Sequence, residues 1–174
     1  MNDSALLVID VQVNMFAEGN SVYEGERMLA TLRHLIAQAH AAHAQVIYIQ
    51  NNGSEVDPDL PGTPGWQLHP AVAPVAGDLV IQKHTPDSFY ETSLHSELEA
   101  KEIHSLIMAG MQTDYCINAT CRRAFELGYE VTLVENAHST YANRESSAPQ
   151  IINRYNEELR KIITLKAAKD IAFG

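Results

Sequence analysis

The chain has 174 residues, of which 45% are hydrophobic and 20% charged, and its formal net charge at pH 7 is −10. This length and composition are typical of one globular domain, here residues 1–174, and they exclude a disordered segment. The acidic balance, with no basic cluster, excludes a nucleic-acid-binding surface, whose affinity for phosphates comes from lysine and arginine.

The amino-terminal residues do not resemble a targeting signal. The first apolar run covers only residues 5–9, whereas a secretory signal has a basic start and a longer apolar region. No segment approaches the roughly 18 apolar residues that a membrane-spanning helix needs. We therefore expect a cytoplasmic protein that does not bind a membrane.

Strand-like and helix-like segments alternate in the first half of the chain. The continuous apolar run at residues 5–10 predicts a buried parallel strand. Apolar residues at helical spacing predict a helix over residues 25–43, and residues 45–50 form the second expected strand. Residues 51–77 contain five prolines and four glycines, and an irregular segment of this length usually has a function.

The alternation continues to the carboxyl terminus. Strands are expected at 78–83, 104–109, 131–135 and, weakly, 162–165. Helices are expected at 93–101 with Thr92 as N-cap, at 115–127 ending before Gly128, and at 146–161. This order predicts a single-domain α/β fold, a Rossmann-like three-layer sandwich whose six-stranded, mostly parallel sheet has helices on both faces.

Three reactive side chains lie at the expected carboxyl ends of strands, where such sheets bind ligands. Asp10 ends the first strand, Lys83 ends the third, and Cys116 follows the fourth. Because Cys116 lies in the first turn of an expected helix, we expect a lowered thiol pKa and backbone amides suited to an oxyanion. Asp10 can accept the thiol proton, and Lys83 favours the thiolate.

Each of these residues also has a purely structural interpretation. A cysteine near a helix start is commonly a small core residue. Asp10 is also suited to capping the turn after its strand, and Lys83 to a solvated strand end. Cys121 lies five residues after Cys116, so on a helix the two thiols point roughly 140° apart and cannot form a disulfide within it.

The eight histidines raise the alternatives of metal or Cys–His chemistry. His40 and His43 share an expected helix but lack an H-E-x-x-H context, so a solvated helix face is the preferred interpretation. On a strand, His84 would point to the face opposite Lys83. His138 follows the fifth expected strand and is the alternative base for Cys116.

Short motifs occur in a specific order along the chain. They are V-I-D-V-Q at residues 8–12 with Phe16, P-G-T-P-G-W at 61–66 with H-P at 69–70, Lys83 with S-F at 88–89 and T-S-L at 92–94, G-M-Q-T-D-Y-C at 110–116, and then Thr120, Ala124, G-Y at 128–129 and Val131. This ordered set, which covers about three quarters of the chain, resembles the isochorismatase-like cysteine hydrolases. That family includes nicotinamidases, N-carbamoyl amidases and isochorismatases.

The resemblance implies a catalytic triad of Asp10, Lys83 and Cys116. It also implies a cis peptide bond between Met111 and Gln112, and an oxyanion hole formed by the backbone amides of Gln112 and Cys116. The fold that it implies is a six-stranded parallel sheet with flanking helices. Members of this family commonly form dimers or larger homo-oligomers, in which a neighbouring subunit can help to close the pocket.

Two departures from the family pattern limit what the resemblance implies. Nicotinamidases have a metal site that begins D-x-H after the second strand, whereas residues 50–53 here are Q-N-N-G. We therefore expect neither a metal nor a cofactor. Many relatives have aspartate where this chain has Asn136. Isochorismate cleavage protonates a vinyl ether and can proceed without a cysteine, so Cys116 favours acyl transfer at an amide or carbamoyl carbon.

Four aromatic residues, Phe16, Trp66, Phe89 and Tyr115, lie in or beside the loops at the expected active edge. They are expected to line an apolar pocket for a small molecule, or alternatively to anchor loops or pack subunits. The leading hypothesis is a metal-independent hydrolase that cleaves C–N bonds through a thioester. The alternatives are an isochorismatase-type vinyl ether hydrolase and a non-catalytic module that binds a small ligand such as a flavin.

Overall fold

The central strand of the sheet, β1 (Ser4–Ile9), is buried on both faces in the computed structural model, which describes residues 3–174. Leu6 and Val8 belong to one hydrophobic cluster, and Leu7 and Ile9 belong to the cluster on the opposite face. A parallel strand covered on both faces requires apolar residues at consecutive positions. The prediction of a buried strand here is confirmed.

The main sheet has six parallel strands in the order β5-β4-β1-β6-β7-β8. The strands other than β1 are β4 (Gln45–Asn51), β5 (Leu79–Lys83), β6 (Ser105–Met111), β7 (Glu130–Ser139) and β8 (Thr164–Lys166). The chain adds β4 and β5 on one side of β1, and β6, β7 and β8 on the other. Since all strands are parallel, their carboxyl ends share one edge, and the direction of winding changes between β1 and β6, where α/β sheets bind ligands.

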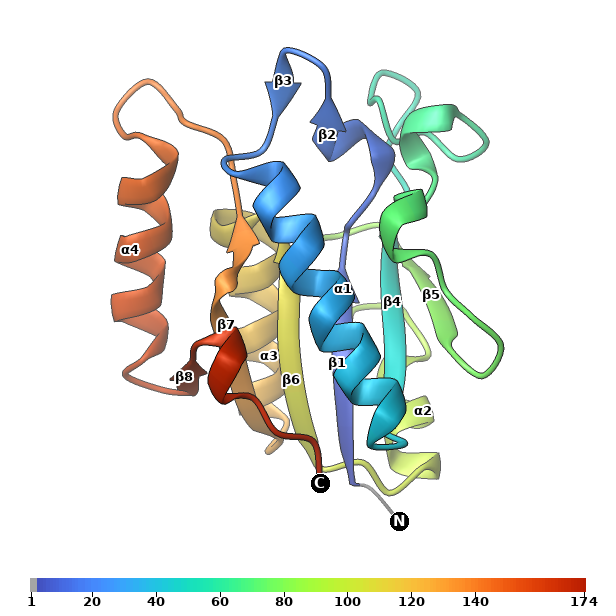
Figure 1. The fold of residues 1–174 in the computed structure, drawn as a ribbon. Coiled ribbons are helices and arrows are strands. Elements are labelled where there is room, and N and C mark those ends of the chain that lie inside the picture. Colours follow the sequence, from blue (N-terminus) through green and yellow to red (C-terminus); the bar gives the residue numbers. More distant parts are fainter. Residues whose placement is uncertain (1–2) are drawn as a thin grey trace.

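Helices cover both faces of the sheet, as the three-layer prediction requires (Figure 1). Helix α1 (Gly25–Ala41) packs on one face, and α2 (Leu94–Ala100) and α3 (Asn118–Glu126) pack on the other. Helix α4 (Ala148–Leu159) contacts α3 and β7. Within residues 3–174 no helix is long and apolar enough to cross a bilayer.

Several element boundaries differ from the sequence prediction. A two-stranded antiparallel hairpin, β2 (Phe16–Ala17) and β3 (Asn20–Ser21), lies where no element was predicted. Strand β7 continues to residue 139, beyond a shift in its register against β6 between Met108 and Gly110. His138 therefore lies within a strand rather than after it.

The start of α2 also differs slightly. Ser93 is the N-cap residue, but its side chain makes no capping hydrogen bond. The hydroxyl of Thr92, the predicted N-cap, instead accepts a hydrogen bond of 3.3 Å from the amide of Leu94.

The segment between β4 and β5, residues 52–78, contains only the short 3-10 turns η2 (Pro64–Trp66) and η3 (Pro70–Val72). Its first part lies at the carboxyl edge of the sheet, and the chain then returns to the start of β5 (Figure 1), where the carbonyl of Gly77 accepts a hydrogen bond of 2.9 Å from Gln45. The carbonyl of Trp66 in this segment accepts hydrogen bonds from Gln12, just after β1, and from Gln50 in β4, at 2.8 and 2.9 Å. The long irregular segment is thus packed against the strand ends.

Candidate active site

Asp10, Lys83 and Cys116 meet at the carboxyl edge of the sheet. The Lys83 Nζ atom lies 3.0 Å from Asp10 Oδ2 and 3.3 Å from Cys116 Sγ. Asp10 and Lys83 are almost completely buried, with exposed fractions of 1% and 0%. Three residues from separate strand ends therefore come within hydrogen-bonding reach, and Lys83 is not a solvated strand end.

The backbone at Asp10 is in the left-handed region, with φ of 52°. This conformation is uncommon for residues other than glycine and occurs often at functional sites. The Asp10 amide still donates to the carbonyl of Ile49 at 2.9 Å, so the sheet pairing continues to this residue. The carboxylate leaves the end of the sheet there and enters the site.

Cys116 lies in η4 (Thr113–Ile117), a single π-helical turn between β6 and α3. The predicted position in the first turn of an α-helix is therefore wrong, because α3 begins only at Asn118. The peptide bond between Met111 and Gln112 is cis. The carbonyl of Gln112 accepts hydrogen bonds from the amides of Tyr115 and Ile117, both at 3.1 Å, which closes the turn around Cys116.

A glycine permits the close contact between β6 and β1 just before this turn. Gly110 has φ of +132°, and a Cβ atom at this position would collide with the backbone of Ile9. Any other residue would push β6 away from β1. The glycine in the G-x-x-T-x-x-C motif thus lets the turn with the thiol sit next to Asp10.

The ionisation of the three groups is coupled. Burial raises the pKa of Asp10, the nearby ammonium of Lys83 opposes this, and the charge of Asp59 adds to the rise. Burial lowers the pKa of Lys83, but Asp10 and Cys116 raise it by more, so the ammonium stays protonated. The resting site therefore holds an ion pair between Lys83 and a carboxylate whose raised pKa suits it to accept a proton.

The expected lowering of the thiol pKa is wrong for this resting site. Burial raises the pKa of Cys116 to about 12, and the charge of Asp10 raises it further than Lys83 can offset. A thiol beside an ionised carboxylate does not lose its proton readily to solvent. Transfer of the proton to Asp10 instead leaves one anion beside Lys83 and keeps the net charge of the site.

One oxygen of Asp10 is left for such a transfer. Oδ2 pairs with Lys83, whereas Oδ1 is buried and has no hydrogen-bond donor of good geometry among residues 3–174. The thiol of Cys116 still interacts favourably with the ionised carboxylate. Asp10 therefore has one oxygen committed to Lys83 and one available to take the thiol proton.

His138 is engaged on both ring nitrogens. Its Nδ1 lies 2.7 Å from Thr113 Oγ1, and its Nε2 lies 2.7 Å from Asn156 Oδ1. The Asn156 nitrogen donates to the carbonyl of Glu135 at 3.2 Å, so its oxygen faces the ring. His138 Nε2 therefore carries the hydrogen and Nδ1 accepts from Thr113. The geometry does not support a Cys116–His138 pair; His138 links η4 to α4 instead.

His138 should make the protein sensitive to acid. Its complete burial lowers the pKa to about 4. As the pH falls from 6.5 to 4 the unfolded chain gains the proton first, so roughly 3 kcal/mol of the free energy of unfolding should be lost. Urea unfolding across this range should show a flatter profile for His138→Gln than for the wild type. Equal slopes in the two proteins would contradict this assignment.

A cavity of about 410 Å³ opens beside the three residues. Its lining consists of Asp10, Asn14, Met15, Asn51, Asp57, Pro58, Asp59, His84, Thr85, Pro86, Gln112, Tyr115 and Cys116. Of the four aromatic residues predicted to form its wall, only Tyr115 does so. The cavity is instead rich in carboxylate and amide groups.

The other three aromatic residues stabilise neighbouring parts of the fold. Phe16 packs edge-on against His69 with ring centroids 4.8 Å apart. Trp66 Nε1 donates to Asn52 Oδ1 at 2.7 Å. Phe89 is buried in the core beneath α2 and α3. None of these three residues lines the cavity, so this part of the pocket prediction is wrong.

Three polar residues outside the predicted site residues support the site. The Oδ1 atom of Asn51 accepts a hydrogen bond of 2.9 Å from Lys83, and its Nδ2 donates to Asp59 at 2.7 Å. Gln12 is almost completely buried and bonds both the amide and the carbonyl of Asn51, at 2.8 and 3.0 Å. Only Gln12, in the motif V-I-D-V-Q, had a sequence signal.

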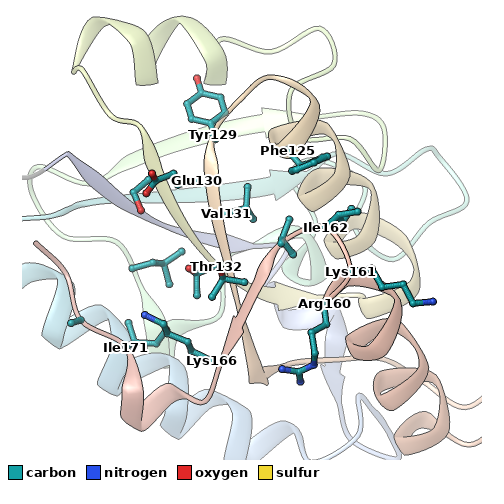
Figure 2. A pocket seen from close by; sticks show the side chains of 15 residues that line it. Phe125, Tyr129, Glu130, Val131, Thr132, Arg160, Lys161, Ile162, Lys166 and Ile171 are labelled. Carbon is teal, nitrogen blue, oxygen red and sulfur yellow. The ribbon is translucent and has the colours of Figure 1, made fainter.

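Two other features lie away from the reaction site. Asn136 Oδ1 accepts a hydrogen bond from the amide of Ala168 at 2.8 Å and so holds the carboxyl-terminal segment. A hollow of about 620 Å³ beside β8 is lined in part by Arg160, Lys161 and Lys166, as Figure 2 shows. None of the three reactive residues lines this hollow.

Within residues 3–174 no three or more histidine, cysteine, aspartate or glutamate side chains are grouped so that they could hold a metal ion.

Similarity to known proteins places this architecture in a family. The isochorismatase domain model matches residues 4–166. A streptothricin hydrolase of Streptomyces noursei is 40% identical over 137 residues, which cover 79% of this chain and 50% of that protein. The uncharacterized isochorismatase family protein YddQ of Bacillus subtilis is 34% identical over 140 residues, covering 79% and 78%.

A solved structure agrees with these sequence relatives. The N-carbamoylsarcosine amidase from Thermoplasma acidophilum superposes with a TM-score of 0.81 at 25% identity, covering 97% of this chain and 98% of the other. The chain spans about half the length of the streptothricin hydrolases that it matches. The resemblance carried by the ordered motifs is confirmed, and this chain belongs to the isochorismatase family.

Proposed function

We propose that this protein hydrolyses a carbon–nitrogen bond of a small amide or carbamoyl compound through a thioester at Cys116. The observation that carries the proposal is that a thiol and a carboxylate line one cavity, with the buried Lys83 ammonium within 3.3 Å of the sulfur and 3.0 Å of the carboxylate. These groups supply a nucleophile, a general base and a fixed positive charge. Two relatives are named as a hydrolase and an amidase, which supports this reaction class.

The reaction begins when the Cys116 proton moves to Asp10 and the sulfur attacks the carbonyl carbon. The carbonyl electrons move to oxygen, and the backbone amides of Gln112 and Cys116 stabilise this oxyanion. Collapse of the intermediate breaks the C–N bond, and Asp10 returns the proton to the leaving nitrogen. Water then attacks the thioester and gives a proton to Asp10. The C–S bond breaks, the acid leaves, and the sulfur recovers its proton.

The charge of the cavity favours this proposal over isochorismate hydrolysis. Asp57 and Asp59 line the cavity, and hydrogen bonds from Ser54 lower the pKa of Asp57. No lysine or arginine lines the cavity in the described part of the chain. Isochorismate carries two carboxylates, which the acidic lining would repel. A neutral or cationic amide avoids this repulsion.

A substrate screen with matched cysteine variants tests the proposal. Primary amides, lactams, carbamoyl compounds and isochorismate would be incubated with wild type, Cys116→Ala and Cys121→Ala. We expect release of ammonia or amine by wild type and Cys121→Ala, and a loss of at least about 1,000-fold in Cys116→Ala. Cys121 is a suitable control because it is fully buried in the core.

Intact-protein mass spectrometry during turnover should show an acyl group on the wild type and none on Cys116→Ala. Turnover that survives in Cys116→Ala would contradict the thioester route. Cleavage of isochorismate without cleavage of any amide would favour the vinyl ether alternative. A protein that purifies with bound flavin and hydrolyses nothing would favour the binding module.

A further inference from the structure

The Lys83 side chain has to cross one strand to reach its partners. Lys83 ends β5 and Asp10 follows β1, and β4 lies between these strands. Neighbouring strands are about 4.8 Å apart, so the two backbones are separated by roughly 10 Å. The residue at the end of β4 in register with Lys83 is Asn51. Asn51 is thus the residue that the lysine side chain passes.

Three acceptors surround the Lys83 ammonium. They are Asp10 Oδ2 at 3.0 Å, Cys116 Sγ at 3.3 Å and Asn51 Oδ1 at 2.9 Å. An ammonium group has three hydrogens to donate, so these contacts use all of them. Lys83 therefore acts through its charge and position and has no hydrogen left for a substrate.

The Asn51 amide is oriented from its other end. Its Nδ2 donates to Asp59 Oδ2 at 2.7 Å, which turns Oδ1 toward Lys83. Asp59 is only 7% exposed, and its carbonyl accepts a hydrogen bond of 3.0 Å from the Gly53 amide. A Cβ atom at Gly53 would collide with the Asp59 carboxylate. Glycine at residue 53 thus lets the loop place Asp59 against Asn51.

We propose that Asn51 is a positioning residue that holds the Lys83 ammonium between Asp10 and Cys116, and that Asp59 sets the orientation of its amide. This role rests on the proposed function, because holding the ammonium in place affects the reaction only if Cys116 is the nucleophile. Asp10 becomes neutral when it accepts the thiol proton, and the sulfur becomes neutral in the thioester. Asn51 is the ammonium's one acceptor whose charge stays constant, so it keeps Lys83 in place through every step.

The chemistry at residue 51 is specific for an amide. A carboxylate there would compete for the ammonium and would face the Asp59 carboxylate at hydrogen-bonding distance, where like charges repel. An alanine would leave one ammonium hydrogen without an acceptor in a buried site. The neutral amide avoids both problems because one end accepts and the other donates.

The test measures the rate of Cys116 alkylation by iodoacetamide from pH 7 to 9.5, with mass spectrometry of the labelled peptide. In Asn51→Ala and Asn51→Asp we expect rates about 10- to 100-fold below the wild type at each pH, because the thiolate loses a fixed ammonium. Asn52→Ala is the matched control. Its side chain bonds Gln82 and Trp66 and should leave the rate unchanged.

The double variant Asn51→Asp/Asp59→Asn isolates the orienting role of Asp59. It reverses the hydrogen bond between residues 51 and 59: the amide at residue 59 donates to the carboxylate at residue 51, whose other oxygen still accepts from Lys83. The repulsion between two carboxylates is removed, so we expect the double variant to recover at least about tenfold of the loss in Asn51→Asp. The charged or titratable groups that face the thiol or line its cavity are Asp10, Lys83, Asp57, Asp59, His84 and Tyr115. All of them other than Asp59 are unchanged in these variants.

Thermal unfolding of each variant shows whether a lower rate comes from a folded protein. Wild-type alkylation rates in folded Asn51→Ala would overturn the proposal, and so would a double variant that recovers none of the loss in Asn51→Asp. Because alkylation needs no substrate, these outcomes differ from a failure of the proposed amide hydrolysis. That failure would appear as absent turnover in the wild type itself.

Discussion

Replacing Asp10 with asparagine is expected to lower kcat by about 10³- to 10⁴-fold. Asparagine has nearly the same shape as aspartate, but its amide cannot accept the Cys116 proton. Burial raises the pKa of Asp10 and so prepares the carboxylate for this transfer. Single-turnover kinetics on the substrate from the screen would measure the loss, and acyl-enzyme formation should slow in parallel.

His138→Gln serves as the comparison for this experiment. Both nitrogens of His138 are bonded to Thr113 and Asn156, so the ring has none free to replace Asp10 as the base. We therefore expect His138→Gln to keep the chemical step within a few-fold of the wild type wherever it is folded. Activity that survives Asp10→Asn and is lost in His138→Gln would move the base role to the histidine.

Lys83→Met should cause the largest loss of stability of any single change at the site. The ammonium is completely buried and pairs with the buried carboxylate of Asp10. Removing one partner of a buried ion pair leaves the other charge uncompensated, which typically costs about 3–5 kcal/mol. Urea unfolding at pH 7 would measure the change in the free energy of unfolding. The thiolate would lose its cation as well, so turnover should disappear.

This loss should shrink as the pH falls. Without Lys83 the pKa of Asp10 rises further above the value of about 3.9 that an aspartate has in an unfolded chain. The folded variant then binds a proton at a higher pH than the unfolded chain does. The cost is therefore complete above the folded pKa and fades as the pH falls toward 4. A stability gap between variant and wild type that is constant from pH 8 to pH 4.5 would contradict this account.

The double variant Lys83→Met/Asp10→Asn separates charge from packing. Removing both charges leaves no uncompensated carboxylate, so it should regain most of the stability lost in Lys83→Met. The regained part should shrink as the pH falls, because the loss in Lys83→Met itself fades when Asp10 takes up a proton. A double variant less stable than Lys83→Met would show that packing of the lysine side chain, rather than its charge, dominates.

The order of the sheet could be predicted because it depends on local patterns. The continuous apolar run of β1 has to be buried on both faces, and strands that alternate with helices are parallel. Parallel strands end at one edge, so Asp10, Lys83 and Cys116 could be placed together from their positions alone. Boundaries were less accurate where non-local pairing decides them, as in the extension of β7 past residue 135.

The residues that support Asp10, Lys83 and Cys116 could not be predicted in this way. Asn51 contacts Lys83, which lies 32 residues away in the sequence, and Asp59, which lies in an irregular loop. No periodic pattern marks such contacts, because they depend on how the loop folds back over the strand ends. The rings of Trp66 and Phe89 were misplaced for the same reason. The sequence of a loop indicates that a residue lies near the edge of the sheet. It does not indicate which way the side chain points.

The sequence by itself determined the family, the layers and the identity of the three reactive residues, because motif order and apolar periodicity are local properties of the chain. Only the tertiary structure decided the protonation state of the site. A pKa depends on burial and on charges brought from distant segments, and at Cys116 burial and the Asp10 carboxylate outweigh the Lys83 ammonium. The thiol therefore rests protonated, and the ammonium is held in place by an asparagine that no motif had indicated.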